Sequence, residues 1–243
     1  MACGDSEDTA AATCAGDAAL PLLTVAIQAG GESRRMGRSK ATVPFLGRPL
    51  LARVVSRVAP IADEVLVSTN EPENLGFLQE LPCACKVRLV RDVHDRRSSL
   101  GGLCTAFSLA KTEFVAVGAC DMIFLAPELY RFELETLAAD PSLAAAVPVL
   151  EEGFEPFHAV YRRELCLPHA EAALAAGRRS VRAFLDGVRV REVTPAEVDA
   201  VAPGGRCFLN TNTPEELAAA ERLVREVEGW GTARSHMATS SDQ

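Results

Sequence analysis

Residues 25–41 read VAIQAGGESRRMGRSKA and join an apolar run to a glycine-rich, basic loop. A short apolar run that is stopped by glycines indicates a buried strand feeding a loop. Glycines let backbone amides approach a ligand closely. Four basic side chains add positive charge to the same loop: Arg34, Arg35, Arg38 and Lys40. The stretch therefore predicts a strand followed by a loop that binds an anion such as a polyphosphate.

The composition makes this basic loop stand out. The chain has 243 residues, 48% of them hydrophobic and 24% charged, which is typical of a globular domain. Its formal net charge of −8 disfavours binding to nucleic acid or to an anionic membrane through bulk electrostatics. No apolar run approaches the roughly 20 residues that span a bilayer, and the acidic N-terminus makes a poor signal peptide. We therefore expect a cytoplasmic protein.

The eight cysteines do not form a recognisable metal or disulfide pattern. Cys83 and Cys85 make a C-x-C pair, but no C-x-x-C and no second pair with zinc-finger spacing are present. Cysteines in such a chain mostly serve as small buried apolar residues. The sequence therefore disfavours a structural metal site.

Strand and helix patterns alternate in the first half of the chain. Short apolar runs predict strands at residues 22–27, 64–68, 86–90 and 114–118. Apolar residues at helical spacing predict a helix at 50–58, and Ser98 opens another that reaches about residue 110. This alternation predicts an α/β fold, a Rossmann-like three-layer sandwich with a mostly parallel central sheet and helices on both faces.

The second half of the chain is less regular. Helices are predicted at 128–138, 165–176 and 180–185, and strands at 144–149, 154–161 and 188–193. A capping box opens the last helix, since Thr213 can act as N-cap with Pro214 at N1 and Glu216 at N3. We predict one domain over residues 20–228, between a flexible tail at 1–19 and a disordered tail at 229–243.

Polar residues follow each of the first four predicted strands. These positions are residues 28–31, Asn70, Asp92 and Asp121. A single Asn or Asp after a strand is more often a turn or cap residue, but four such positions at the carboxyl edge of one parallel sheet predict a ligand site. The loop after the first strand contains neither a P-loop motif nor G-x-G-x-x-G, so neither a P-loop NTPase nor a dinucleotide oxidoreductase is favoured.

Residues 30–40, GGESRRMGRSK, resemble the G-G-x-S-x-R-M-G-x-x-K signature of nucleotidyltransferases with a glycosyltransferase-A-type fold. Three later segments are similar to those of the molybdenum cofactor guanylyltransferase family, in the same order: ACDMIFL at 119–125, EPFHAVY at 155–161 and FLNTNTPEE at 208–216. The resemblance covers about residues 22–227. It implies transfer of GMP from GTP to molybdopterin, giving molybdopterin guanine dinucleotide and pyrophosphate.

The resemblance also implies roles for individual residues. Lys40 and Arg35 would neutralise the triphosphate, and Asp121 would hold Mg²⁺, the expected cofactor. The nucleotide site would include Gln28, Ala29, Gly30, Gly31, Lys40, Asn70, Asp92 and Asp121. The family's acceptor side corresponds to Asn210 and Asn212.

Several assignments stay open. The two asparagines could instead brace a loop and cap the last helix, and His158 is as consistent with a core histidine as with a pterin contact. A basic run is formed by Arg178, Arg179 and Arg182. A solvent-exposed surface is the favoured interpretation of this run, and a pterin site is the alternative. Departures from the family pattern fall at Gln28 (commonly Leu), Ser39 (commonly Asp), Ile123 (commonly Pro) and Ser98-Ser99 (commonly Gly-Pro).

Two other functions remain as alternatives. One is a related nucleotidyltransferase that uses CTP with molybdopterin or acts on a sugar or polyol phosphate. The other is a non-catalytic carrier that binds nucleotide or pterin. Transient contact with proteins that make or receive the molybdenum cofactor is a further expectation from the resemblance.

Overall fold

The computed structural model describes residues 20–30, 39–93 and 98–227. The two predicted tails, at 1–19 and 229–243, lie outside the described residues. Within the described ranges, none of the helices is both long and apolar enough to cross a membrane.

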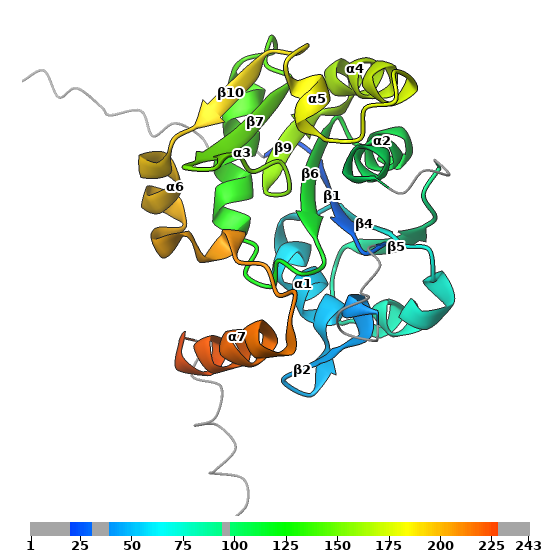
Figure 1. Cartoon of the computed structure of the whole chain (residues 1–243), viewed down its shortest axis with the longest axis vertical. Coiled ribbons are helices and arrows are strands. Elements are labelled where there is room, and N and C mark those ends of the chain that lie inside the picture. The colour runs from blue at the N-terminus through cyan, green and yellow to red at the C-terminus, as the bar shows by residue number, and fades with distance from the viewer. Residues whose placement is uncertain (1–19, 31–38, 94–97, 228–243) are drawn as a thin grey trace, which may run out of the picture.

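The centre of the molecule is an eight-stranded sheet (Figure 1). Its strand order is β10 (Val190–Val193), β7 (Ala145–Leu150), β9 (Ala159–Arg162), β6 (Phe114–Ala119), β1 (Leu23–Gln28), β4 (Glu64–Ser68) and β5 (Lys86–Val90), with β8 (Gly153–Phe154) paired to β7. Strands β6, β1, β4 and β5 run parallel, whereas β9 is antiparallel to both of its neighbours. The predicted mostly parallel sheet is confirmed.

Helices cover both faces of the sheet, and a separate apolar core lies under each layer. One core is closed by α1 (Leu50–Val58), α3 (Pro127–Ala139), α6 (Pro195–Val201) and α7 (Pro214–Val227). The other is closed by α2 (Ser99–Leu109), α4 (Arg163–Ala175) and α5 (Arg182–Leu185). Side chains alternate across β1, so Val25 and Ile27 belong to the first core and Ala26 to the second. The predicted three-layer sandwich is therefore confirmed.

Strand register brings the predicted site residues to one edge. Gln28 at the end of β1 pairs with Ser68 at the end of β4 and with Ala119 at the end of β6. Ser68 in turn pairs with Val90, the last residue of β5. In Figure 1 the arrowheads of β1 and β6 point to the same edge of the sheet. Parallel pairing thus aligns the loops that follow all four strands.

A small hairpin follows the first loop. After the 3₁₀ helix at Lys40–Thr42, β2 (Pro44–Phe45) pairs with β3 (Arg48–Pro49). The turn residues Leu46 and Gly47 have φ of +48° and +80°, as a type I′ turn requires. Glycine adopts a positive φ at the second position without steric strain. The N–H of Leu46 donates to Glu221 Oε1 on α7 at 2.8 Å, so the hairpin is tied to the last helix.

Two parts of the second half differ from the prediction. The strand predicted at 154–161 is interrupted by a turn, which leaves β8 and β9 as separate strands. Pro156 lies in this turn, and proline has no N–H to donate to a ladder. Residues 195–208 form α6 and a 3₁₀ segment (Pro203–Phe208), neither of which was predicted. The start of α6 could have been predicted from the sequence, because Thr194 and Glu197 have the spacing of a capping box and form one.

Candidate functional site

The segment that follows β1 lies against the ends of β4 and β5. The N–H of Ala29 donates to the carbonyl of Ser68 at 2.8 Å. A methyl group placed on Gly30 would lie 3.2 Å from Asn70 Nδ2 and 3.6 Å from Asp92 Oδ2. Gly30, Asn70 and Asp92 therefore come together from three different strand ends. Gly31 and Arg35, the other predicted members of this loop, lie outside the described residues.

Gln28 packs its amide against the first turn of α2. A methyl group on Gly102 would lie only 2.7 Å from Gln28 Cδ and Oε1, so a side chain at this position would displace the Gln28 amide. Gln28 Nε2 is buried, and within the described residues it has no hydrogen-bond partner. A buried donor without an acceptor is unfavourable by about 1–3 kcal/mol. Gln28 Nε2 is therefore a donor that has no acceptor among the described residues.

Lys40 joins the basic loop to two distant parts of the chain. Its Nζ donates to Asp121 Oδ2 at 2.9 Å and to Asn212 Oδ1 at 2.6 Å. The Lys40 and Asp121 side chains are each 20% exposed, which makes this a partly buried ion pair that ligands can still reach. Burial raises the pKa of the neighbouring Cys120 thiol to about 12, with the Asp121 carboxylate as a further cause. Among the described residues, the cluster thus brings together the ammonium of Lys40, the carboxylate of Asp121 and the amide of Asn212.

Thr211 fixes the segment that carries Asn212, and the sequence did not single it out. Both its N–H and its Oγ1 donate to the main-chain carbonyl of Asp121, at 3.0 and 3.1 Å. On the other side, the backbone N–H groups of Asn212 and Thr213 donate to Glu216 Oε2, and Glu216 N–H donates to Thr213 Oγ1 at 3.1 Å. The last two bonds are the predicted capping box at the start of α7, which is confirmed.

Glu155 is a second residue near the cluster that the sequence did not single out. It lies in the turn between β8 and β9, where its Oε1 accepts from the N–H of Phe157 at 3.2 Å. Burial raises the pKa of Glu155, and the negative charge of Asp121 raises it further. The negative charge of Asp121 therefore acts on the carboxyl group of Glu155. Glu155 belongs to the EPFHAVY motif, but the spacing of that motif gave no indication of a site role.

His158 lies in the core, so the predicted contact between this residue and the pterin is wrong. The side chain has no exposed surface, its ring stacks on Tyr130 with centroids 4.1 Å apart, and its Nε2 accepts from the N–H of Ala126 at 3.0 Å. Burial lowers the pKa of His158 to about 3, so the imidazole is neutral. Complete burial contradicts direct contact with a bound pterin. The histidine instead holds the loop after Asp121, through Ala126.

Asn210, the other asparagine predicted on the acceptor side, is exposed. Asn210 donates through Nδ2 to the carbonyl of Phe208 at 3.5 Å, so its surroundings differ from those of Asn212. Arg178, Arg179 and Arg182 are also exposed. The carbonyl of Arg179 accepts from the N–H of Leu100 and from Ser99 Oγ, both at 3.1 Å. The loop that carries Arg179 therefore borders the start of α2 through its backbone.

The donor set at this edge suits a hard cation that is shared with a substrate. In the part of the chain that the structure describes, no group of three or more His, Cys, Asp or Glu side chains could hold a metal ion by itself. Mg²⁺ is commonly bound by one or two carboxylates together with substrate phosphates and waters. The carboxylate of Asp121, already beside a cation, fits that mode of binding.

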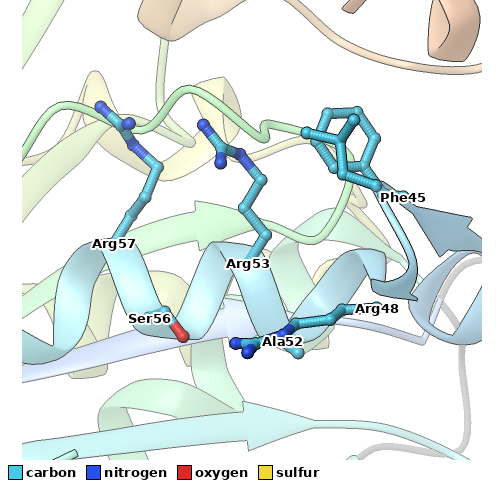
Figure 2. Close-up of a pocket in the computed structure, with 7 residues that line it drawn as sticks. Phe45, Arg48, Ala52, Arg53, Ser56 and Arg57 are labelled. Atoms are coloured by element: carbon cyan, nitrogen blue, oxygen red, sulfur yellow. The ribbon is translucent and has the colours of Figure 1, made fainter. Parts of the chain in front are cut away.

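A second concave region lies along α1. A pocket of about 260 Å³ is lined by Phe45, Leu46, Arg48, Ala52, Arg53, Ser56 and Arg57. Figure 2 shows that Arg53 and Arg57 extend from one side of the helix, whereas Arg48 and Ser56 lie on the other side. Arg53 stacks over Phe45, and Arg57 Nε donates to the carbonyl of Leu125 at 2.9 Å. Two of the basic groups of this pocket, Arg53 and Arg57, therefore lie on one side of the helix and the third, Arg48, on the other.

The fold and the main site define an α/β nucleotide-binding protein, since the ligand groups lie at the carboxyl ends of parallel strands. Residues 25–193 match the model of the MobA-like NTP transferase domain, and the chain belongs to this family. It is therefore a nucleotidyltransferase.

Individual relatives agree with the family assignment. The molybdenum cofactor guanylyltransferase of Desulfosudis oleivorans is 33% identical over 208 residues, covering 85% of this chain and 98% of the relative. A protein of Natronomonas pharaonis named "probable molybdenum cofactor guanylyltransferase" is 37% identical over 212 residues, covering 82% and 98%. The crystal structure of molybdopterin-guanine dinucleotide biosynthesis protein A from Archaeoglobus fulgidus superposes with a TM-score of 0.68 at 23% identity, covering 84% of this chain and 99% of that chain. At 23% identity, this structural similarity supports the assignment of the fold alone.

Proposed function

We propose that this chain transfers GMP from GTP to molybdopterin, giving molybdopterin guanine dinucleotide and pyrophosphate. The observation that carries the proposal is the junction at Lys40, which bonds at once to Asp121 and to Asn212. It connects the basic nucleotide loop with the segment that, by family resemblance, faces the acceptor. The names of the relatives support guanylyl as the transferred group.

The reaction needs two anions to approach each other. A phosphate oxygen of molybdopterin forms a bond to the α-phosphorus of GTP, and the bond from that phosphorus to the oxygen bridging to the β-phosphate breaks, so that pyrophosphate leaves with the electron pair. Little covalent chemistry falls to the protein, so positioning and neutralisation of charge supply most of the catalysis. Lys40 and Arg35 provide that positive charge in the proposal, and the amides of Gly30 and Gly31 assist.

The remaining residues take the roles that the resemblance implies. Gln28, Ala29, Asn70 and Asp92 contact the base and ribose, and the Nε2 of Gln28 supplies a donor. Asn210 and Asn212 face the acceptor. Asp121 would hold Mg²⁺, which when bound neutralises charge on the phosphate oxygens.

The test is a comparison of nucleotides with the purified protein. Protein, Mg²⁺ and molybdopterin are incubated with GTP, CTP, ATP or UTP, and pyrophosphate release and the dinucleotide product are quantified. We expect turnover with GTP that requires molybdopterin. Turnover with CTP but not GTP would replace the guanylyl assignment by a cytidylyl one. Absence of product with every nucleotide, while nucleotide still binds, would favour the non-catalytic carrier.

A further inference from the structure

The loop that leads into β5 places two cysteines in one pocket. Cys83 and Cys85 are partly exposed free thiols, whereas the other cysteines that the structure describes are buried: Cys104, Cys120, Cys166 and Cys207. The pocket has a volume of about 520 Å³, and its wall includes both Cys83 and Cys85 as well as Asp63. We propose that Cys83 and Cys85 form a thiol–disulfide exchange site, at which a low-molecular-weight disulfide converts the two thiols into an intramolecular disulfide.

The geometry of the loop allows the two sulfur atoms to join. A disulfide needs Cα atoms that are less than about 7 Å apart, and two residues of fully extended chain span about that distance. The chain bends at Ala84 and Cys85, which shortens the span. Cys83 Sγ donates to the carbonyl of Cys85 at 3.5 Å, so its side chain is directed toward Cys85. A disulfide can therefore form with adjustments confined to this loop.

The environment of Cys85 indicates which thiol attacks first. The pKa of the Cys85 thiol is raised to about 11, mainly by burial and then by the charge and the hydrogen bond of the Cys83 thiol, with the charge of Asp63 as a smaller cause. A thiol with this pKa is almost entirely protonated at neutral pH, and only the thiolate attacks a disulfide. The first attack therefore falls to Cys83, and Cys85 acts second.

The exchange consists of two balanced steps. The Cys83 thiolate forms a bond to one sulfur of the incoming disulfide, whose S–S bond breaks, and the first thiolate leaves with the electron pair. Cys85 Sγ then loses its proton to solvent, bonds to Cys83 Sγ and displaces the second thiolate. The two cysteines are oxidised, the small disulfide is reduced to two thiols, and those thiols take up the protons. The position of Cys85 beside the mixed disulfide offsets its low thiolate fraction.

This pocket lies at the opposite edge of the sheet from the nucleotide loops. Asp63 precedes the first residue of β4, and Cys85 precedes the first residue of β5. Those two first residues, Glu64 and Lys86, are paired in register, so the pocket lies at the amino ends of the parallel strands. The exchange is therefore separate in space from the proposed transfer reaction, and it does not depend on that function.

The test maps oxidation in the folded full-length chain. The protein is incubated with oxidised glutathione near neutral pH, quenched with acid, alkylated and digested with trypsin for mass spectrometry. Cleavage after arginine and lysine leaves both cysteines in one peptide, residues 58–86. We expect this peptide to lose two hydrogens at least about tenfold faster than any of the four buried cysteines reacts.

Single substitutions separate the two steps. Cys85→Ser should stop at a mixed disulfide between Cys83 and glutathione. Cys83→Ser should react at least about tenfold more slowly, because burial, the main cause of the raised pKa of Cys85, remains. The matched control replaces Cys3 and Cys14 together by serine. These two residues lie outside the described residues, and their replacement should leave oxidation of the 58–86 peptide as in the parent.

Three results would overturn the inference. The first is a parent protein in which both thiols of the 58–86 peptide survive an excess of oxidised glutathione. The second is a disulfide that joins Cys83 or Cys85 to another peptide. The third is oxidation of the buried cysteines at the same rate, because the exchange would then follow unfolding of the whole chain. The parent protein provides all three measurements, so it decides the question where circular dichroism shows that a variant is unfolded.

Discussion

The main-chain carbonyl of Asp121 accepts two hydrogen bonds from one residue, Thr211, through its N–H at 3.0 Å and its Oγ1 at 3.1 Å. Asp121 follows β6, whereas Thr211 lies just before α7 and is 90 positions later in the chain. The proposed metal-binding residue and the proposed acceptor segment are therefore joined through the backbone. The two hydrogen bonds hold these segments next to each other.

Replacing Thr211 by Val tests this connection. The substitution preserves the shape of the side chain and the N–H bond but removes the hydroxyl, with a loss of about 1 kcal/mol. We expect the KM for molybdopterin to rise by about fivefold while the affinity for GTP stays unchanged. Thr211→Ser, which keeps the hydroxyl, should behave like the parent. Thr136→Val is the matched control, since Thr136 Oγ1 donates to the carbonyl of Phe132 at 2.8 Å, within α3. Equal KM values for Thr211→Val and Thr136→Val would contradict the prediction.

Removing the carboxylate of Asp121 should stop the reaction and leave the fold intact. In Asp121→Ala, Lys40 keeps its contact with Asn212, and the main-chain carbonyl still binds Thr211. We expect a loss of transfer of at least about 100-fold, as for other groups that stabilise charge in a transition state. Circular dichroism and thermal melting should show a folded protein. A folded variant with an unchanged rate would disprove the role of Asp121 as the metal ligand.

Gln28→Leu should separate stability from nucleotide binding. The substitution removes a buried donor that has no partner among the described residues, so the free energy of unfolding should rise by about 1 kcal/mol. The same variant should bind GTP about fivefold more weakly, because the proposed contact from Nε2 is lost. Urea denaturation and isothermal titration calorimetry measure the two effects. Gln79→Leu, at an exposed position, serves as the control. A less stable variant with parental GTP affinity would refute both parts.

Glu133 gives a prediction for the pH dependence of stability. Complete burial raises the pKa of its carboxyl well above the ordinary value, and neither oxygen has a hydrogen-bond partner within the described residues. A raised pKa means that the folded chain keeps the proton while the unfolded chain loses it. The contribution of Glu133 to stability is then full below the ordinary carboxyl pKa and is lost as pH rises through the raised value.

The corresponding variant is Glu133→Gln, which is neutral at every pH. Its free energy of unfolding relative to the parent should increase from pH 5 to pH 8, by at most about 1.4 kcal/mol per pH unit. Urea denaturation at several pH values provides the measurement. Glu135→Gln, on an exposed position of the same helix, should follow the parent at each pH. A constant difference between Glu133→Gln and the parent across this range would show that the carboxyl is ionised in the folded state.

Local patterns predicted most of the fold. The five residues 64–68 were expected as a strand and form β4, and Thr213 and Glu216 were expected as a capping box and form one. Such features depend on side chains a few positions apart, so they can be read from the sequence. The turn that divides β8 from β9 was less apparent, because the apolar pattern continues on both sides of Pro156.

The sequence by itself determined the alternation of strands and helices, and with it the edge at which Gly30, Asn70, Asp92 and Asp121 would gather, because parallel strands must end together. Only the tertiary structure decided which atoms meet there. Asn212 reaches Lys40 over 172 positions, an approach that no local pattern specifies. His158 stands in an apolar stretch that suits a ligand contact and a core position equally, and packing against Tyr130 placed it in the core. Burial and long-range contact arise from the whole fold, which is why they appear only in three dimensions.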